Sequence, residues 1–256
     1  MVVAVAVGLT LLVRGWGDSE LTLPDPPVGS AVLPDLQPSP PIDLRTKLVK
    51  DKWFIAFSSI LVNVGEGAFV LRATREDNRP WRVFQEIPYS ESGARSIRIP
   101  ARMVYAGDGH HHWHVARVAT ARLVRIDDSG KPTADESGRI DTKIGFCFFD
   151  YTHDLERGPE NAVYHRRGCG HEDDDFIRMG LSDGWTDTYK FVLRGQRIPI
   201  TGLPDGKYRL WADADEAELF REVTRDNNRT WADFDLSTRA DGIRLAVLDA
   251  VGPKPK

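Results

Sequence analysis

Long apolar stretches with the 3.6-residue period of an amphipathic helix are absent from this sequence. Short apolar runs separated by polar turns follow one another instead, as in Trp53–Ile60, Ala68–Ala73, Trp81–Ile87 and Met103–Ala106. Runs of this length bounded by turn residues are typical of strands. We therefore predict an all-β fold with a β-sandwich core, long irregular loops and little helix, in preference to a barrel.

A block of lysine or arginine is also missing. The 34 basic residues are scattered and slightly outnumbered by 38 acidic ones, which gives a net charge of −4. The isoelectric point is near 6.0. Proteins that bind nucleic acid usually carry a concentrated basic face, so nucleic acid is not an expected partner.

No apolar run is long enough to cross a bilayer, and no membrane span is predicted. The run Val2–Val13 instead has the length of the apolar part of a secretory signal peptide, although no basic residue precedes it. We expect residues 1–16 to be a truncated signal peptide and the protein to be secreted; the alternative is a buried N-terminal strand. Residues 17–32 are expected to form a proline-rich linker, residues 33–240 the folded domain, and residues 241–256 a C-terminal strand or tail.

Cysteine is scarce, with only Cys147 and Cys169 in the chain. An even pair in an exported protein is expected to form one disulfide. Closing a loop of about 22 residues stabilises the fold by on the order of 3 kcal/mol, through the entropy it removes from the unfolded chain. The alternative is two buried free thiols.

Histidine, in contrast, is concentrated. Four of the seven histidines fall within residues 110–114, in the order His-His-His-Trp-His, and strand-like sequence flanks them. Alternate side chains of a strand share one face, so His110, His112 and His114 are predicted to point one way, with His111 facing away. The pattern predicts a metal site; the alternative is ordinary hydrogen-bonded core or surface histidines.

The spacing adds a geometric condition. Three alternate residues of a straight strand span about 13 Å, too far for three imidazoles to reach one ion. The backbone must therefore bend, and Gly107 and Gly109 are the residues expected to permit it. Imidazole ligands suit copper, zinc, nickel or iron and exclude calcium or magnesium as the ion of this site.

A long segment without clear strand pattern runs from Asp150 to Tyr189. Connections of that length are usually functional or disordered. Its aromatic residues, histidines and cysteine favour an ordered segment. Its acidic run, Glu172–Asp175, either attracts a protonated amine or is simply solvated.

From Leu33 to Leu236 the sequence resembles the lysyl oxidase catalytic domain, in a microbial-type form that lacks most cysteines of animal members. The resemblance rests on several short motifs that occur in the family's order and near its spacing. They are Asp108–Val115, Lys143–Cys147, Tyr164–Arg167, Gly180–Ser182, Asp187–Tyr189, and the turn Pro204–Tyr208 followed by Asn227–Asn228.

The resemblance implies a copper-dependent amine oxidase. The family's copper ligands fall on His110, His112 and His114, and its lysine tyrosylquinone cofactor falls on Lys143 and Tyr189. The implied reaction converts a primary amine, such as peptidyl lysine, to an aldehyde with molecular oxygen as acceptor, and releases ammonia and hydrogen peroxide. Without the resemblance, Lys143 reads as a strand-edge lysine and Tyr189 as a half-buried aromatic.

Asp187 is our candidate for the catalytic base, because residues two apart on a strand share a face and Asp187 precedes Tyr189 by two. The alternative is an aspartate that caps a turn. Two readings of the whole chain remain open at this point. One is the amine oxidase, and the other is a secreted β-sandwich binding or adhesion module that holds metal structurally and forms no quinone.

The resemblance also implies a calcium site made of oxygen ligands. Thr224 stands where the family often has aspartate, which weakens the expectation, and the alternative is a turn stabilised by asparagine side chains. The implied ligands are Asp35, the carbonyl of Leu36, Glu222, Asn227 and Asn228.

Overall fold

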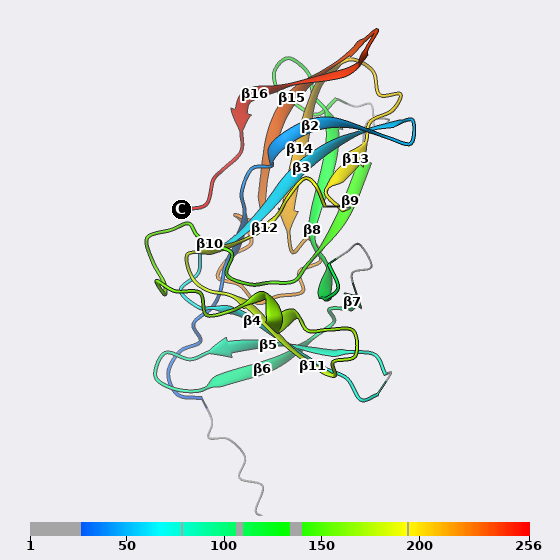
Figure 1. Ribbon diagram of the computed structural model, residues 1–256. Helices are drawn as coiled ribbons and strands as arrows, with labels where there is room; N and C mark the ends of the chain where they lie inside the picture. Colours follow the sequence, from blue (N-terminus) through cyan, green and yellow to red (C-terminus); the bar gives the residue numbers. More distant parts are fainter. Residues whose placement is uncertain (1–26, 78, 106–109, 134–139, 194) are drawn as a thin grey trace, which may run out of the picture.

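The computed structural model is built almost entirely of antiparallel strands, which confirms the all-β prediction (Figure 1). Among the described residues there is no helix of seven or more residues, and no helix is long and apolar enough to cross a membrane. A short 3-10 turn, η2 (Arg166–Cys169), matters for the site. The structure describes residues 27–77, 79–105, 110–133, 140–193 and 195–256, without the side chains of residues 140–143 and 250.

The first sheet is organised around its longest strand, β3 (Lys52–Asn63). β3 contains the apolar run predicted as a strand, and it is buried over two continuous stretches that include Ile55, Phe57 and Leu61. Five shorter strands pair with it directly or through a neighbour. They are β1 (Leu36–Pro38), β2 (Ile42–Val49), β10 (Thr152–His153), β12 (Trp185–Tyr189) and β13 (Arg197–Pro199).

The second sheet contains β8 (Trp113–Arg125), which begins inside the histidine run. A strand at the C-terminal end of the chain, β16, pairs with β15 in this sheet. The other members are β7 (Met103–Tyr105), β9 (Ile140–Phe146), β14 (Gly206–Ala214), β15 (Arg229–Arg239) and β16 (Gly242–Val251).

A third sheet of four strands lies at one end of the molecule (Figure 1). Its order is β11 (Phe176–Leu181), β4 (Phe69–Thr74), β5 (Arg82–Pro88) and β6 (Ala94–Ile99). Val28 and Ala31, from the predicted linker, form isolated bridges with Ser92 and Tyr89 beside this sheet. Residues 1–26 lie outside the described part of the chain.

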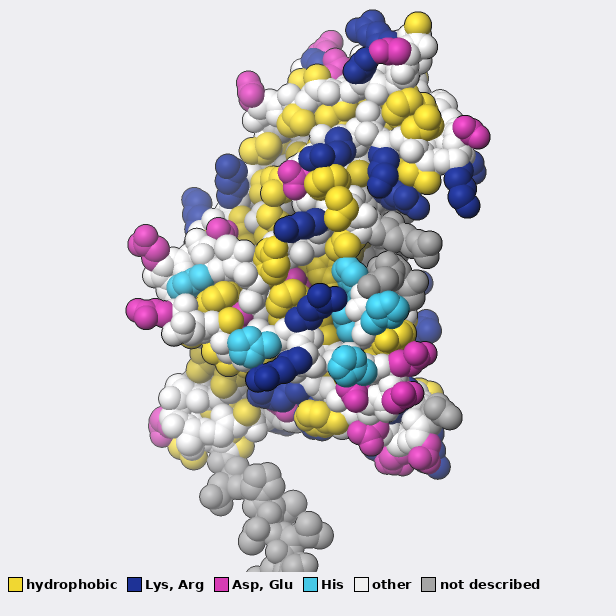
Figure 2. All heavy atoms as spheres, viewed as in Figure 1, with side chains coloured by type: hydrophobic (Ala, Val, Ile, Leu, Met, Phe, Trp, Pro, Cys, Tyr) yellow, Lys and Arg dark blue, Asp and Glu magenta, His cyan; other side chains and the backbone are white. Residues whose placement is uncertain are grey.

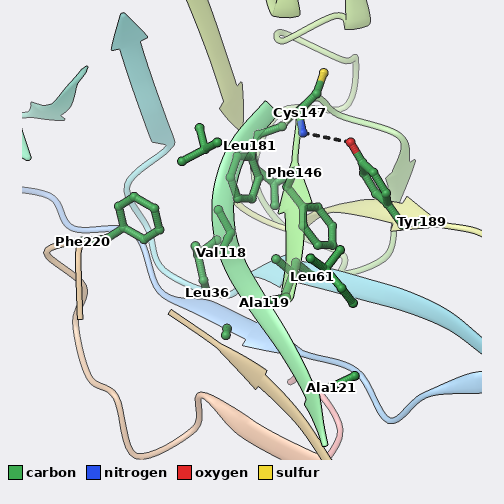
Figure 3. Packing of buried hydrophobic residues seen from close by; sticks show 14 of the residues in the cluster. Leu36, Leu61, Val118, Ala119, Ala121, Phe146, Cys147, Leu181, Tyr189 and Phe220 are labelled. Atoms are coloured by element: carbon green, nitrogen blue, oxygen red, sulfur yellow. Dashed lines mark hydrogen bonds between the residues drawn. The ribbon is translucent and has the colours of Figure 1, made fainter. Parts of the chain in front are cut away.

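One hydrophobic core joins the three sheets (Figure 3). The Phe69 ring of β4 packs edge-on against Phe148 and Phe220, with ring centroids 4.7 and 4.8 Å apart. Phe146 of β9 packs on Tyr189 of β12, with centroids 4.3 Å apart. The end of β12 is therefore fixed against the ends of β8 and β9, where the predicted site residues lie.

The segment from Asp150 to Tyr189 is ordered, as predicted, but it is less irregular than predicted. It contains β11 and β12, whose buried residues pair with β4 and β3. The buried carboxylate of Asp150 fastens the segment by accepting hydrogen bonds from the backbone of Val163, Tyr164 and Ser182 and from the Ser182 hydroxyl. The predicted disulfide between Cys147 and Cys169 forms and ties η2 to the residue that follows β9.

Candidate metal centre

The three alternate histidines come together, as the spacing predicts. Each of His110, His112 and His114 offers a ring nitrogen, and these three atoms lie within 4.8 Å of one another. The Nε2 atoms of His112 and His114 are 2.9 Å apart. His112 and His114 are buried and His110 is half-buried, so the cluster lies just beneath the surface. This part of the chain can hold a metal ion.

The separations can be compared with those around an ion. Two nitrogens bound about 2.0–2.1 Å from one ion, at angles between a right angle and a tetrahedral one, lie roughly 2.8–3.4 Å apart. The 2.9 Å between His112 and His114 falls in that range. A separation of up to 4.8 Å is slightly too wide for one ion. A small side-chain rotation, which a half-buried His110 can make, completes the set.

The backbone bends within the histidine run itself. The run is not a single strand bent at a glycine, as we expected. β8 begins at Trp113, so His110 and His112 come from the turn that precedes it. His111 adopts the left-handed conformation, with φ 40°; its side chain is exposed and is not part of the three-histidine cluster, although it lines a hollow together with His110 and His112. Gly107 and Gly109, where we expected the bend, lie outside the described residues.

Trp113 holds the start of β8 in place. Its indole N–H donates to the carbonyl of His171 (2.7 Å), and its ring packs edge-on against Trp81 and Tyr105. A second irregularity follows at Arg117, which has φ 61° in a stretch where β8 carries extra residues relative to β9. The contacts of Trp113 and the irregularity at Arg117 lie on either side of His114 along β8. They orient the strand so that the His114 ring reaches Tyr189 of β12.

Tyr189 is the residue that joins the histidines to the first sheet. Its hydroxyl oxygen lies 3.2 Å from Nε2 of His114 and accepts a hydrogen bond from the backbone N–H of Cys147 at 2.9 Å (Figure 3). The Phe146 ring covers one side of the Tyr189 ring, and the side chain is buried. The phenol oxygen is therefore held beside the ligand atom of His114.

Lys143 lies on β9, where its backbone pairs opposite Thr120 of β8. Its side chain lies outside the described residues. Two residues further along β9, Gly145 passes so close to β8 that an added Cβ would lie 3.3 Å from the Cβ of His114. The strand that carries Lys143 thus runs to the histidine site and continues into Cys147, which holds Tyr189.

Asp187 is fully buried on β12, and Tyr189 two residues later is also buried. Burial raises the pKa of its carboxyl well above the ordinary range, and the charge of Asp150 adds to the shift. The backbone N–H of Thr188 opposes it only in part, and neither carboxyl oxygen of Asp187 makes a hydrogen bond of normal geometry. Burial therefore disfavours the charged form of Asp187.

A pocket of about 260 Å³ opens beside the histidines. His110, His112 and Tyr189 contribute to its wall, and Asp187 does not. The sequence reasoning missed most of the remaining wall. It consists of Phe149, Tyr151, Arg166, Thr188, Lys190, Val192 and Leu193.

Four of the residues implied for calcium also meet. The Asp35 carboxylate accepts from Asn227 (3.0 Å), and Glu222 accepts from Asn228 (3.1 Å) and from the backbone N–H of Leu36 (2.7 Å). One side-chain oxygen each of Asp35, Asn227 and Asn228 is buried without a donor. Burial raises the pKa of Asp35, and it raises that of Glu222 to about 7. This concentration of unsatisfied oxygens fits an oxygen-liganded cation.

Comparison of the sequence with protein-family models gave no match, and comparison with curated proteins found no significant match. The site is therefore interpreted from its own geometry and from the motifs in the sequence.

Proposed function

We propose that this protein is a copper-dependent amine oxidase of the lysyl oxidase type, which deaminates primary amines such as peptidyl lysine. The observation that carries the proposal is the position of the Tyr189 hydroxyl, 3.2 Å from a ring nitrogen of the three-histidine cluster. A structural metal site has no need of a phenol at that distance. A site that oxidises its own tyrosine requires one.

The donor set supports copper. Three imidazoles without a thiolate or carboxylate suit a transition metal, and the adjacent phenol gives a redox-active one a target. When bound, copper and dioxygen supply the oxidising power that converts a phenol to a quinone, and the quinone supplies the carbonyl that a primary amine attacks.

The residues of the chain have separate tasks in this proposal. His110, His112 and His114 hold the ion, while the N–H of Cys147 and the Phe146 ring fix the Tyr189 ring and keep water from one side. Asp187 is the proposed base for the α-proton of the bound amine: it acts in its carboxylate form, which burial makes more basic, and the reacting carbon must reach it past the wall that Thr188 and Tyr189 form. The overall reaction consumes the amine, dioxygen and water, and yields aldehyde, ammonia and hydrogen peroxide.

Lys143 is proposed to supply the amine that links to the Tyr189 ring. Its strand, β9, continues into Cys147, whose backbone N–H holds the Tyr189 hydroxyl.

The test is mass spectrometry of peptides after expression with and without copper. A cross-linked pair containing Lys143 and Tyr189 is expected only with copper, and neither Lys143→Arg nor Tyr189→Phe should give it. Peroxide release with a simple alkylamine should follow the same pattern. Unmodified peptides from fully copper-loaded protein would instead support a secreted β-sandwich module that holds metal structurally.

The cluster around Asp35 and Glu222 is proposed to bind calcium and to fasten β1 to the turn before β15. Calcium should raise the melting temperature of metal-free protein, and magnesium should not, because the crowded oxygens offer more ligands than magnesium accepts alongside its waters. Glu222→Gln should remove the calcium effect. An equal shift in wild type and Glu222→Gln would place calcium elsewhere.

A further inference from the structure

The pocket beside the histidines is amphipathic. One wall is apolar and comes from Phe149, Tyr151, Val192 and Leu193. Tyr151 and Val192 are exposed at the rim (44% and 59%), so this wall continues to the surface. A volume of about 260 Å³ is below that of most drug-sized sites and suits one short chain or ring.

The charge of the pocket is opposite to that expected for a site that selects a cationic substrate. Arg166 and Lys190 line it, and no described residue of its wall is acidic. A second hollow of about 360 Å³ shares His110, His112 and Arg166 and adds Arg167, again with no acidic residue among those described. In Figure 2, dark blue basic side chains lie between cyan histidines on this face, and magenta acidic ones lie on both flanks of them.

The acidic run Glu172–Asp175 does not line either hollow. Glu172 and Asp173 instead lie near Tyr105, whose phenol pKa is raised by burial and, less strongly, by their charges. Asp174 accepts the backbone N–H of His171. Glu172, Asp173 and Asp174 thus lie beside other groups and line neither hollow, while Lys190 lies near Tyr151 and the carboxylate of Asp43.

The arginine turn is fixed in place. Arg166 and Arg167 begin η2, and Cys169 at its end is bound to Cys147, whose backbone N–H also holds Tyr189. Gly168 lies against the β11 backbone, where an added Cβ would meet the carbonyl oxygen of Arg178 at 2.4 Å. Both arginines are exposed, and neither forms an ion pair with a described carboxylate.

We propose that Arg166, assisted by Lys190, selects primary amines that also carry a carboxylate. The amine would lie at Tyr189, the carbon chain against the apolar wall, and the carboxylate at the guanidinium. Arginine binds carboxylates through paired, charge-assisted hydrogen bonds, whereas a second ammonium group would be repelled. This inference rests on the proposed amine oxidase function and names its substrate class as zwitterionic amines.

The test compares three amines with the same six-carbon chain: 6-aminohexanoate, hexylamine and hexane-1,6-diamine. For copper-loaded protein we expect kcat/KM, measured by peroxide release, to fall in that order. Arg166→Gln should lower the ratio of 6-aminohexanoate to hexylamine by roughly tenfold. Arg166→Glu should move the preference to the diamine. Arg98→Gln, an exposed arginine on β6 in another sheet, makes the same charge change and should alter none of these ratios.

A binding measurement separates this inference from the proposed function. Hexanoate, which has no amine, should bind metal-free wild-type protein in calorimetry and bind the Arg166→Gln variant roughly tenfold more weakly. If no amine is oxidised but hexanoate shows this difference, the selectivity stands and the oxidase proposal fails. If amines are oxidised without preference and Arg166→Gln leaves the ratio unchanged, the oxidase stands and the inference is overturned.

Discussion

Tyr189 has two proposed roles: its hydroxyl stabilises the fold by accepting the Cys147 N–H, and its ring becomes part of the cofactor. Replacing Tyr189 with phenylalanine tests the two roles separately. The change deletes one oxygen, which accepts the Cys147 N–H at 2.9 Å and lies 3.2 Å from the His114 ring nitrogen. The ring and its packing on Phe146 remain. Because the Cys147 N–H is left buried without its acceptor, unfolding free energy should fall by about 1–3 kcal/mol. The three histidines are untouched, so copper should still bind.

Urea denaturation of metal-free wild type and Tyr189→Phe measures the first effect, and copper titration with peroxide assays measures the second. The expected result is a lower midpoint with an unchanged slope, retained copper binding, and no amine oxidation. Tyr208→Phe is a matched control, since the Tyr208 hydroxyl donates to the carbonyl of Pro204, away from the site. Amine oxidation by Tyr189→Phe would refute the assignment of the quinone to this residue. Unchanged stability would refute the hydrogen bond.

Three further changes test the neighbouring features. Replacing both Cys147 and Cys169 with alanine should lower unfolding free energy by about 3 kcal/mol, since the loop they close spans 22 residues; an unchanged urea midpoint would contradict this. His112→Ala should weaken copper binding by more than about 100-fold, because even outer-shell losses cost 10–100-fold. His111→Asn is the control, because asparagine tolerates the positive φ, and it should leave the copper affinity nearly unchanged. If His111→Asn and His112→Ala lose copper affinity equally, the three-histidine site is excluded. Asp187→Asn removes a carboxyl whose pKa in the folded protein is raised above 3.8. The folded state of wild type therefore binds this proton more tightly than the unfolded state, and wild type should lose stability as pH rises from about 4 through the raised pKa. The variant should not show this loss. Melting curves that fall in parallel from pH 4 to 9 would show that Asp187 is not buried as described.

The fold class followed from the sequence because strand periodicity is a local property. The common side of the three histidines followed from their alternate spacing, although only His114 lies on a strand, and the disulfide followed from the cysteine count. The position of the bend did not follow, since it uses a left-handed His111, a conformation uncommon in residues other than glycine. The role of Asp150 was also missed, because its four hydrogen bonds join segments that no local pattern relates.

The arginine turn shows why the substrate side of a site is harder to predict than its ligand side. Arg166 and His110 are distant in sequence but line the same pocket, and Cys147 connects the two sides of it. Its backbone holds the Tyr189 hydroxyl, and its side chain holds the end of η2. A perturbation at Cys147 therefore acts on the proposed cofactor tyrosine and on the proposed carboxylate clamp together. A substitution of Arg166 acts on the clamp alone. Comparing variants of Cys147 with variants of Arg166 therefore distinguishes effects on substrate selection from effects on oxidation.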